Sequence, residues 1–179
     1  MKRVLKALPL LALGMLFTPS LAHAQFGSST GTTNVSVTIG PQAGLNITNS
    51  STPLALSGSG FTGSTALTYF VRTTATGGGG SITLKVTSDF SPTGGPSVAS
   101  PLSAGDGLLY TCTVQSPGTA CTGTQTSSTT SQTNLASFAA NVHSTTGGNS
   151  ASVNWSLNND PGYRTGTYNA TITFTISAS

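Results

Sequence analysis

The sequence predicts an all-β protein whose main domain is a single antiparallel β-sandwich of about seven to nine strands. Three observations carry this prediction. Short stretches in which apolar and polar residues alternate recur along the chain, as expected of half-buried strands. Clusters of Gly, Pro, Asn and Ser, which are typical of turns, separate these stretches. Beyond residue 24, no stretch of normal helix length has a helical period.

The last stretch gives the clearest strand signal. Over residues 168–177 every second residue is apolar, and the residues between them are Asn, Thr or Ser. The turn signal Asp160-Pro161-Gly162 precedes it, and we expect Asp160 to brace this turn by accepting backbone hydrogen bonds. We expect residues 151–157 and 167–177 to form a hairpin at the centre of the sandwich. The predicted core residues of this hairpin are Trp155, Tyr168, Ile172, Phe174 and Ile176.

Residues 1–24 have the pattern of a secretory signal peptide. A basic start is followed by an apolar run over residues 4–17 and by the small-residue cleavage pattern Ala22-His23-Ala24. The mature chain is therefore predicted to begin at Gln25. The apolar run is too short to remain as a membrane anchor, and no later segment approaches membrane-spanning length. We expect an exported protein that is secreted or held at the cell surface by other proteins.

The mature chain has a different charge balance from the precursor. Three of the six basic residues, Lys2, Arg3 and Lys6, lie in the predicted signal peptide, and the other three balance the three aspartates. The formal net charge of +3 therefore argues neither for nucleic-acid binding nor for attraction to an acidic membrane. Glu is absent, so strand edges lack many of the charges that usually keep edges apart.

The beginning of the mature chain combines a lead with an alternating stretch. Residues 25–32 have no periodicity and are interpreted as a flexible lead to a sandwich domain over residues 33–179. Residues 34–39 alternate strictly and are predicted to form a strand that ends at Gly40-Pro41. The apolar face of this strand consists of Val35, Val37 and Ile39. The strand could pair within its own domain or be donated to a neighbour.

Further strands are predicted where other apolar sets alternate. A hairpin through the glycines of residues 76–80 is expected to join two of them. Residues 92–101 and 124–133 are interpreted as loops, and residues 135–142 fit either a bent strand or one helical turn, with strand favoured by context. The predicted strands are centred on residues 45–47, 54–56, 66–72, 82–86, 108–114 and 151–157.

Cys112 and Cys121 are the only cysteines. An exported chain usually pairs its cysteines, and Pro117-Gly118 between them allows the chain to reverse. Two thiols are too few for a metal site, and a redox pair usually has the tighter Cys-x-x-Cys spacing. We therefore predict a structural disulfide, which contributes roughly 2–3 kcal/mol on the chain-entropy model.

No catalytic pattern is present. His143 is the only histidine after processing, and no Gly-x-Ser-x-Gly element surrounds a serine. The three aspartates, Asp89, Asp106 and Asp160, lie in turn contexts and lack the dense oxygen pattern of a calcium loop. The glycines of residues 77–80 lack the Lys-Ser/Thr of a phosphate-binding loop. We expect no enzyme, no metal and no cofactor.

Two segments carry a family resemblance. The ending runs Asp160-Pro161-Gly162-Tyr163, then Gly166-x-Tyr168, then alternating apolar residues, and residues 35–39 read Val-Ser-Val-Thr-Ile. These segments resemble the final strand and the extended first segment of secreted bacterial spore-coat-U-like domains, which are related to archaic chaperone–usher pilins. The resemblance implies an immunoglobulin-like sandwich and a role in extracellular fibres or coats. The single cysteine pair departs from the richer pairing of many such proteins.

A second resemblance is narrower. Trp155-Ser156-Leu157 is similar to the Trp-x-Leu element of a Gram-positive cell-wall-binding domain, but the second half of that pattern is not present.

Two functions are predicted. The first is a self-associating subunit of a surface fibre, pilus or coat, in which residues 34–39 are donated to a neighbour. This subunit is expected neither to bind nucleic acid nor to insert into a membrane. The alternative is a monomeric adhesin or carbohydrate-binding module that uses loops 88–107 and 115–133.

Overall fold

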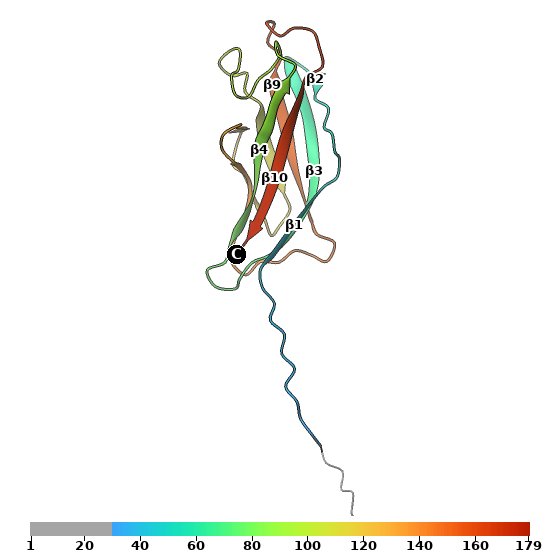
Figure 1. The fold of residues 1–179 in the computed structure, drawn as a ribbon, viewed down its shortest axis with the longest axis vertical. Coiled ribbons are helices and arrows are strands. Elements are labelled where there is room, and N and C mark those ends of the chain that lie inside the picture. Colours follow the sequence, from blue (N-terminus) through green and yellow to red (C-terminus); the bar gives the residue numbers. More distant parts are fainter. Residues whose placement is uncertain (1–29) are drawn as a thin grey trace, which may run out of the picture. The chain divides into compact units, whose positions relative to one another are not determined.

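The computed structural model describes residues 30–179, so the predicted signal peptide and most of the predicted lead lie outside the described residues. Residues 38–179 form one compact unit with two antiparallel sheets packed as a sandwich (Figure 1). This confirms the predicted all-β sandwich. The strands are β1 (Gln42–Ile47), β2 (Ala55–Ser57), β3 (Gly60–Arg72), β4 (Gly80–Ser91), β5 (Leu109–Val114), β6 (Thr119–Ala120), β7 (Gln125–Thr126), β8 (Thr133–Phe138), β9 (Asn149–Asn158) and β10 (Asn169–Ala178).

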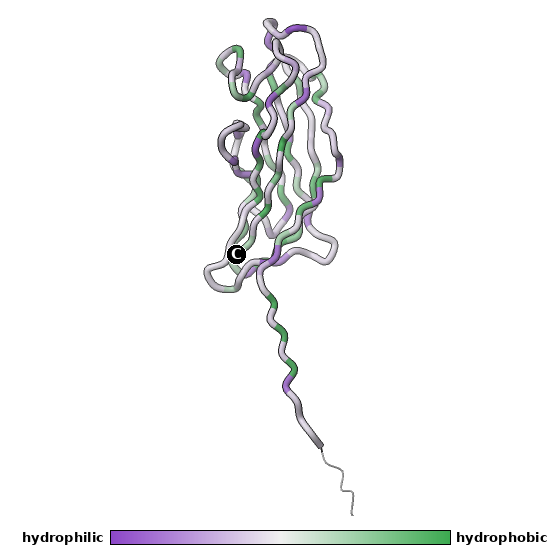
Figure 2. Tube along the Cα trace, in the orientation of Figure 1, coloured by the Kyte–Doolittle hydropathy of each residue, from purple (hydrophilic) through white to green (hydrophobic). Residues whose placement is uncertain are grey.

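The two sheets have different strand orders. The larger sheet has 6 strands in the order β1-β3-β9-β5-β7, with β2 paired to the start of β3. The smaller sheet has 4 strands in the order β10-β4-β8-β6. Hydrophobic and hydrophilic residues alternate along the strands (Figure 2). Each inner face carries every second residue of its strands, which is why the alternating stretches of the sequence became strands here.

Neither of the two expected hairpins is formed. β9 pairs with β3 and β5, whereas β10 pairs with β4 in the other sheet. Likewise β3 and β4 lie in different sheets, so the glycine-containing loop 73–79 crosses between the sheets instead of closing a hairpin. Both connections are longer than the two-residue turns that force consecutive strands to pair, and the chain uses this length to change sheets.

The expected strand over residues 34–39 is also not formed, because residues 30–41 contain no strand and the first strand begins at Gln42. An alternating sequence needs a partner strand before it can be a strand, and the described chain supplies none there. Gly60 opens β3 opposite Ser57 in the short β2–β3 hairpin. The strand interpretation of residues 135–142 is confirmed for residues 135–138, which lie in β8, and is wrong for residues 139–142, which lie outside any strand.

The core lies between the two inner faces. Trp155 is 4 % exposed, and its indole N–H donates to the Thr65 hydroxyl at 2.8 Å. Two buried tyrosines of the larger sheet hydrogen-bond backbone groups elsewhere in the fold. Tyr110 donates to the carbonyl of Asn134 on β8 at 2.9 Å, and Tyr69 donates to the carbonyl of Gln115. Because their hydroxyls are satisfied, these large rings fill the core without leaving an unpaired polar group.

The sandwich has two ends, which we call the tip and the base. The tip is the end where β4 and β9 finish and β10 begins, and its main loops are residues 92–108 and 159–168. The base is the end where β3 finishes and β1 and β4 begin, and its loops are residues 73–79 and 139–148 (Figure 1). β10 therefore runs from the tip to the base.

Candidate functional site

The titratable side chains that a catalytic function would need lie at opposite ends. His143 is exposed at the base, where its backbone bridges to Arg72. Asp89, Asp106 and Asp160 all belong to the tip region. The 10 residues of β9 connect the two ends. At about 3.3 Å per residue, a strand of this length spans roughly 30 Å. None of these carboxylates can therefore orient the His143 ring, as a serine–histidine–aspartate site requires.

Asp89 fastens one loop of the tip. Its carboxylate accepts hydrogen bonds from the backbone N–H groups of Phe90, Val98 and Ala99 and from the Ser97 hydroxyl, at 2.7–3.0 Å. Burial alone would raise the pKa of Asp89, but these hydrogen bonds outweigh it and lower the pKa below its usual value. The ionised carboxylate thus holds loop 92–99 against the end of β4.

Ser103 connects the other two aspartates. Its backbone N–H donates to the Asp106 carboxylate at 3.0 Å, and its hydroxyl donates to Asp160 at 2.8 Å. The Gly162 N–H donates to Asp160 at 2.6 Å, as expected for a braced turn, and this bond lowers the pKa of Asp160, as Ser103 also does. Burial, together with the charges of Asp106 and Asp160, raises the pKa of Tyr163 to about 12. Within residues 30–179, no three His, Cys, Asp or Glu side chains are grouped to hold a metal ion.

One long edge of the sandwich is closed by a covalent bond. Cys112 on β5 of the larger sheet is joined to Cys121, which follows β6 of the smaller sheet, with the two Cα atoms 5.5 Å apart. The Cys121 N–H also donates to the Leu135 carbonyl at 2.9 Å, which extends the pairing of β6 with β8. The predicted disulfide is confirmed. It ties the two sheets together along what we call the closed edge, formed by β5, β6 and β7.

The opposite edge has no such closure. Its outermost strands are β1 in the larger sheet and β10 in the smaller sheet, which lie near each other across the sandwich (Figure 1). In the described part of the chain, β10 has one strand partner, β4, so its other side presents unpaired backbone groups. We call the pair β1 and β10 the open edge.

The apolar row of β10 is incompletely covered. Ile172, Phe174 and Ile176 lie opposite Val86, Leu84 and Ile82 of β4 in the strand register. The three β4 side chains are at most 1 % exposed, whereas the three β10 side chains are only half-buried at the margin of the core. Trp155 is central to the core, and Tyr168 lies outside the core cluster, with its hydroxyl donating to the Arg164 carbonyl at 2.7 Å. The apolar row on β10 is therefore less covered than the row opposite it on β4.

An apolar row of the same spacing is exposed elsewhere in the chain. Val35, Val37 and Ile39 are 92 %, 81 % and 64 % exposed. Residues 34–39 contain no charged residue and no proline, and they are outside any strand. Other large apolar side chains that are exposed in the described chain, such as Leu56 and Leu102, occur singly, so an alternating apolar segment of this kind stands out on the surface.

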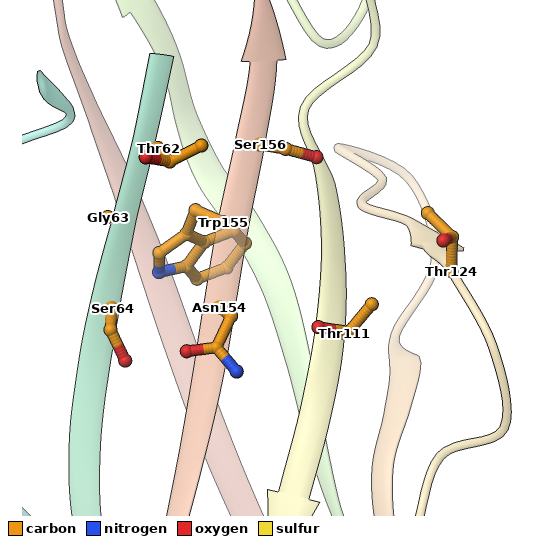
Figure 3. A pocket seen from close by; sticks show the side chains of 8 residues that line it. All are labelled: Thr62, Gly63, Ser64, Thr111, Thr124, Asn154, Trp155 and Ser156. Carbon is orange, nitrogen blue, oxygen red and sulfur yellow. The ribbon is translucent and has the colours of Figure 1, made fainter. Parts of the chain in front are cut away.

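The described surface has hollows on the larger sheet and at the base. One lies on the outer face of the larger sheet and is lined by small polar groups of β3, β5 and β9, with Thr124 at its rim (Figure 3). Asn154 and Thr111 point into it, and the Trp155 ring lies behind the sheet. The other hollow is at the base, where residues 39–44, 70–75 and 141–146 meet. Phe70, which is 43 % exposed, forms part of it.

No protein-family model, no curated protein and no solved structure matches the chain. Among the residues described, no helix is both long and apolar enough to cross a membrane.

The sequence contained a signal for each apolar row separately. It contained none for the position of β10 at an edge, because strand order depends on contacts between distant segments.

Proposed function

We propose that this chain is an exported structural subunit, without enzymatic activity, that self-associates outside the cell into a surface fibre, pilus or coat. Residues 34–39 of one subunit add to the open edge of the next subunit, beside β10. The protein acts in a secreted or surface-attached state and needs no cofactor, nucleic acid or membrane insertion. One observation carries the proposal: the half-buried apolar row of the edge strand β10 occurs in the same chain as an exposed apolar row of equal spacing.

The chemistry of the two rows fits strand addition. A strand placed beside β10 would satisfy its unpaired N–H and C=O groups and cover Ile172, Phe174 and Ile176. Val35, Val37 and Ile39 supply β-branched side chains at every second position, the spacing that one face of a strand requires. Main-chain hydrogen bonds and apolar burial would then act together.

Most of the length of β10 lacks the features that usually prevent strand addition. Protected edges carry Lys, Pro, bulges or inward charges. The residues of β10 include no charged residue and no proline. Its register shifts are confined to the end near Asn169 and Thr171. The stretch from Ile172 to Ala178 is thus a regular edge to which another strand can pair.

The test compares two double variants of the mature chain, residues 25–179. Val35→Asp with Val37→Asp places charges on the apolar row, and we expect it to remain monomeric. Ser36→Asp with Thr38→Asp adds the same charge on the opposite face and should still assemble. Size by light scattering, filaments by electron microscopy and SDS-resistant, heat-labile ladders give the readout.

Several results would count against the proposal. If the unaltered mature chain stays monomeric at high concentration, residues 34–39 are not donated to a neighbour, and the proposal fails. If both double variants lose assembly equally, the apolar row is not the donated element. As a further check, the Val35/Val37 variant should shorten wild-type filaments when mixed with them, because it can accept a strand but cannot donate one.

The hollow on the larger sheet favours one alternative function. Its hydroxyl and amide groups, from Thr62, Ser64, Thr111, Asn154 and Ser156, are of the kind that hydrogen-bond sugars. It would place carbohydrate binding on the sheet face, with only Thr124 coming from the loops 115–133 that the sequence favoured. Glycan arrays with the monomeric Val35/Val37 variant test this function, and the absence of binding removes it.

A further inference from the structure

We propose that consecutive subunits also meet end to end, the base of the donating subunit against the tip of the accepting one. This inference rests on the proposed donation of residues 34–39. It adds a second interface, formed by a second copy of this chain, which would make the assembly a stiff rod and not a flexible string of domains.

The short connection between the donated segment and β1 requires proximity. Only Gly40 and Pro41 lie between Ile39 and Gln42, the first residue of β1. Three extended steps span at most roughly 10 Å. The base of the donating subunit must therefore lie within about 10 Å of the point where its Ile39 leaves the accepting subunit. Proline also restricts the backbone at this point, which limits swivelling.

The direction of strand addition decides which end is met. β10 runs from the tip to the base, so a segment antiparallel to it leaves the accepting subunit at the tip. A parallel segment would leave at the base. There the accepting subunit's own β1 begins, and its loop 73–79 is bonded to the Ser179 carbonyl through Thr74 N–H at 2.9 Å and Gly79 N–H at 3.2 Å. The accepting subunit's own chain thus enters its sandwich at the base, and antiparallel pairing is also slightly more stable per residue than parallel pairing, so we place the exit at the tip.

The two ends also differ in a complementary way. Asp89, Asp106 and Asp160 all belong to the tip, with Arg164 as its one cation in the described chain. Arg72 and His143 belong to the base, beside the hollow that contains Phe70. Leu102 projects from the tip and is 59 % exposed. A head-to-tail contact brings the tip, with its exposed leucine and Asp160, against the base, with Arg72 and the hollow that contains Phe70. Such a heterologous contact repeats without closing.

Cross-linking of the full mature chain tests the contact. Leu102→Cys marks the tip and Ala75→Cys marks the base, and residues 30–179 contain no free cysteine that would react in their place. Within one subunit the two marks lie at opposite ends, so a short bis-maleimide can join them only between subunits. We expect the double variant to give a ladder of covalent oligomers that survives boiling, and each single variant to give none.

A lengthened connection provides the matched control. Four Gly-Ser residues inserted between Pro41 and Gln42 should preserve filaments but lower the cross-linked fraction several-fold. Dimers from Ala75→Cys alone would show that bases meet, and filaments without any cross-linked ladder would show that the ends do not touch. Either result overturns the end-to-end contact while leaving strand donation intact. If the unaltered chain forms no filaments, the proposed function is overturned, and the end-to-end contact with it.

Discussion

The two long edges of the sandwich differ in how far their outer strands are protected from pairing with another chain. At the closed edge, a disulfide joins β5 of one sheet to the end of β6 in the other, although β6 and β7 have only two residues each. At the open edge, β1 and β10 are longer, but no covalent bond joins them, and the apolar row of β10 is half-buried. Short, cross-linked edge strands offer little to a partner, whereas a long uncharged strand offers a row of backbone groups. This difference is the reason why we propose the open edge as the surface that accepts a strand.

The largest expected effect comes from removing one chain terminus or the other. Truncation after Gly166 deletes β10 and exposes the fully buried Ile82 and Leu84 of β4, so we expect it to abolish folding. Deletion of residues 25–40 removes none of the strands β1 to β10 and should leave a folded monomer. Circular dichroism and thermal unfolding measure both. A folded truncation product would show that β10 is dispensable for folding and would contradict its role as the strand that covers β4.

The next effect compares two isoleucines that face each other in the register. Ile82→Ala on β4 should cost roughly 2–5 kcal/mol of unfolding free energy, because this side chain is fully buried. Ile176→Ala on β10 should cost clearly less in the monomer, since that side chain is half-buried. Urea unfolding in the Val35/Val37 background measures the difference. Equal costs would mean that β10 is as well covered as β4.

Loss of the disulfide should weaken the closed edge without changing the open one. Replacing Cys112 and Cys121 by Ala is expected to lower the unfolding free energy by roughly 2–3 kcal/mol on the chain-entropy model. Filament formation should persist wherever the variant remains folded, because the cross-link lies opposite β10. Denaturant unfolding and electron microscopy give the two readouts. A folded variant that no longer assembles would show that the two edges are coupled.

The smallest effect concerns the tip, which belongs to neither edge. Asp89→Asn should cost about 1–3 kcal/mol, because an amide cannot accept equally well the four hydrogen bonds that this carboxylate accepts, three of which come from loop 92–99. The pKa of Asp89 is lowered in the folded chain, so its contribution to stability is complete above the unfolded value of about 3.9 and is lost as the pH falls through the folded value. Unfolding at several acidic pH values measures this loss. The Asp89→Asn variant should show a weaker dependence, and an unchanged slope would assign the acid sensitivity to other groups.

Local features of the fold followed from the sequence, and pairing features did not. Alternation located most of the strands because a half-buried strand must show a period of two wherever its partners are. The disulfide followed from two cysteines in an exported chain. The hairpins between β3 and β4 and between β9 and β10 were wrong because long loops leave the choice of partner open. Residues 34–39 have the pattern of a strand but no partner in the described chain, so local pattern alone was insufficient there.

By itself, the sequence determined the fold class, the alternating rows and the cysteine pair, because each depends on neighbouring residues or on composition. Only the tertiary structure decided that the final strand lies at an edge beside β4, and that the disulfide closes the opposite edge. The physical reason is that strand order arises from contacts between segments far apart in the chain, on which a local period of two places no constraint. The same alternating pattern is buried in β4, half-covered in β10 and exposed at residues 34–39.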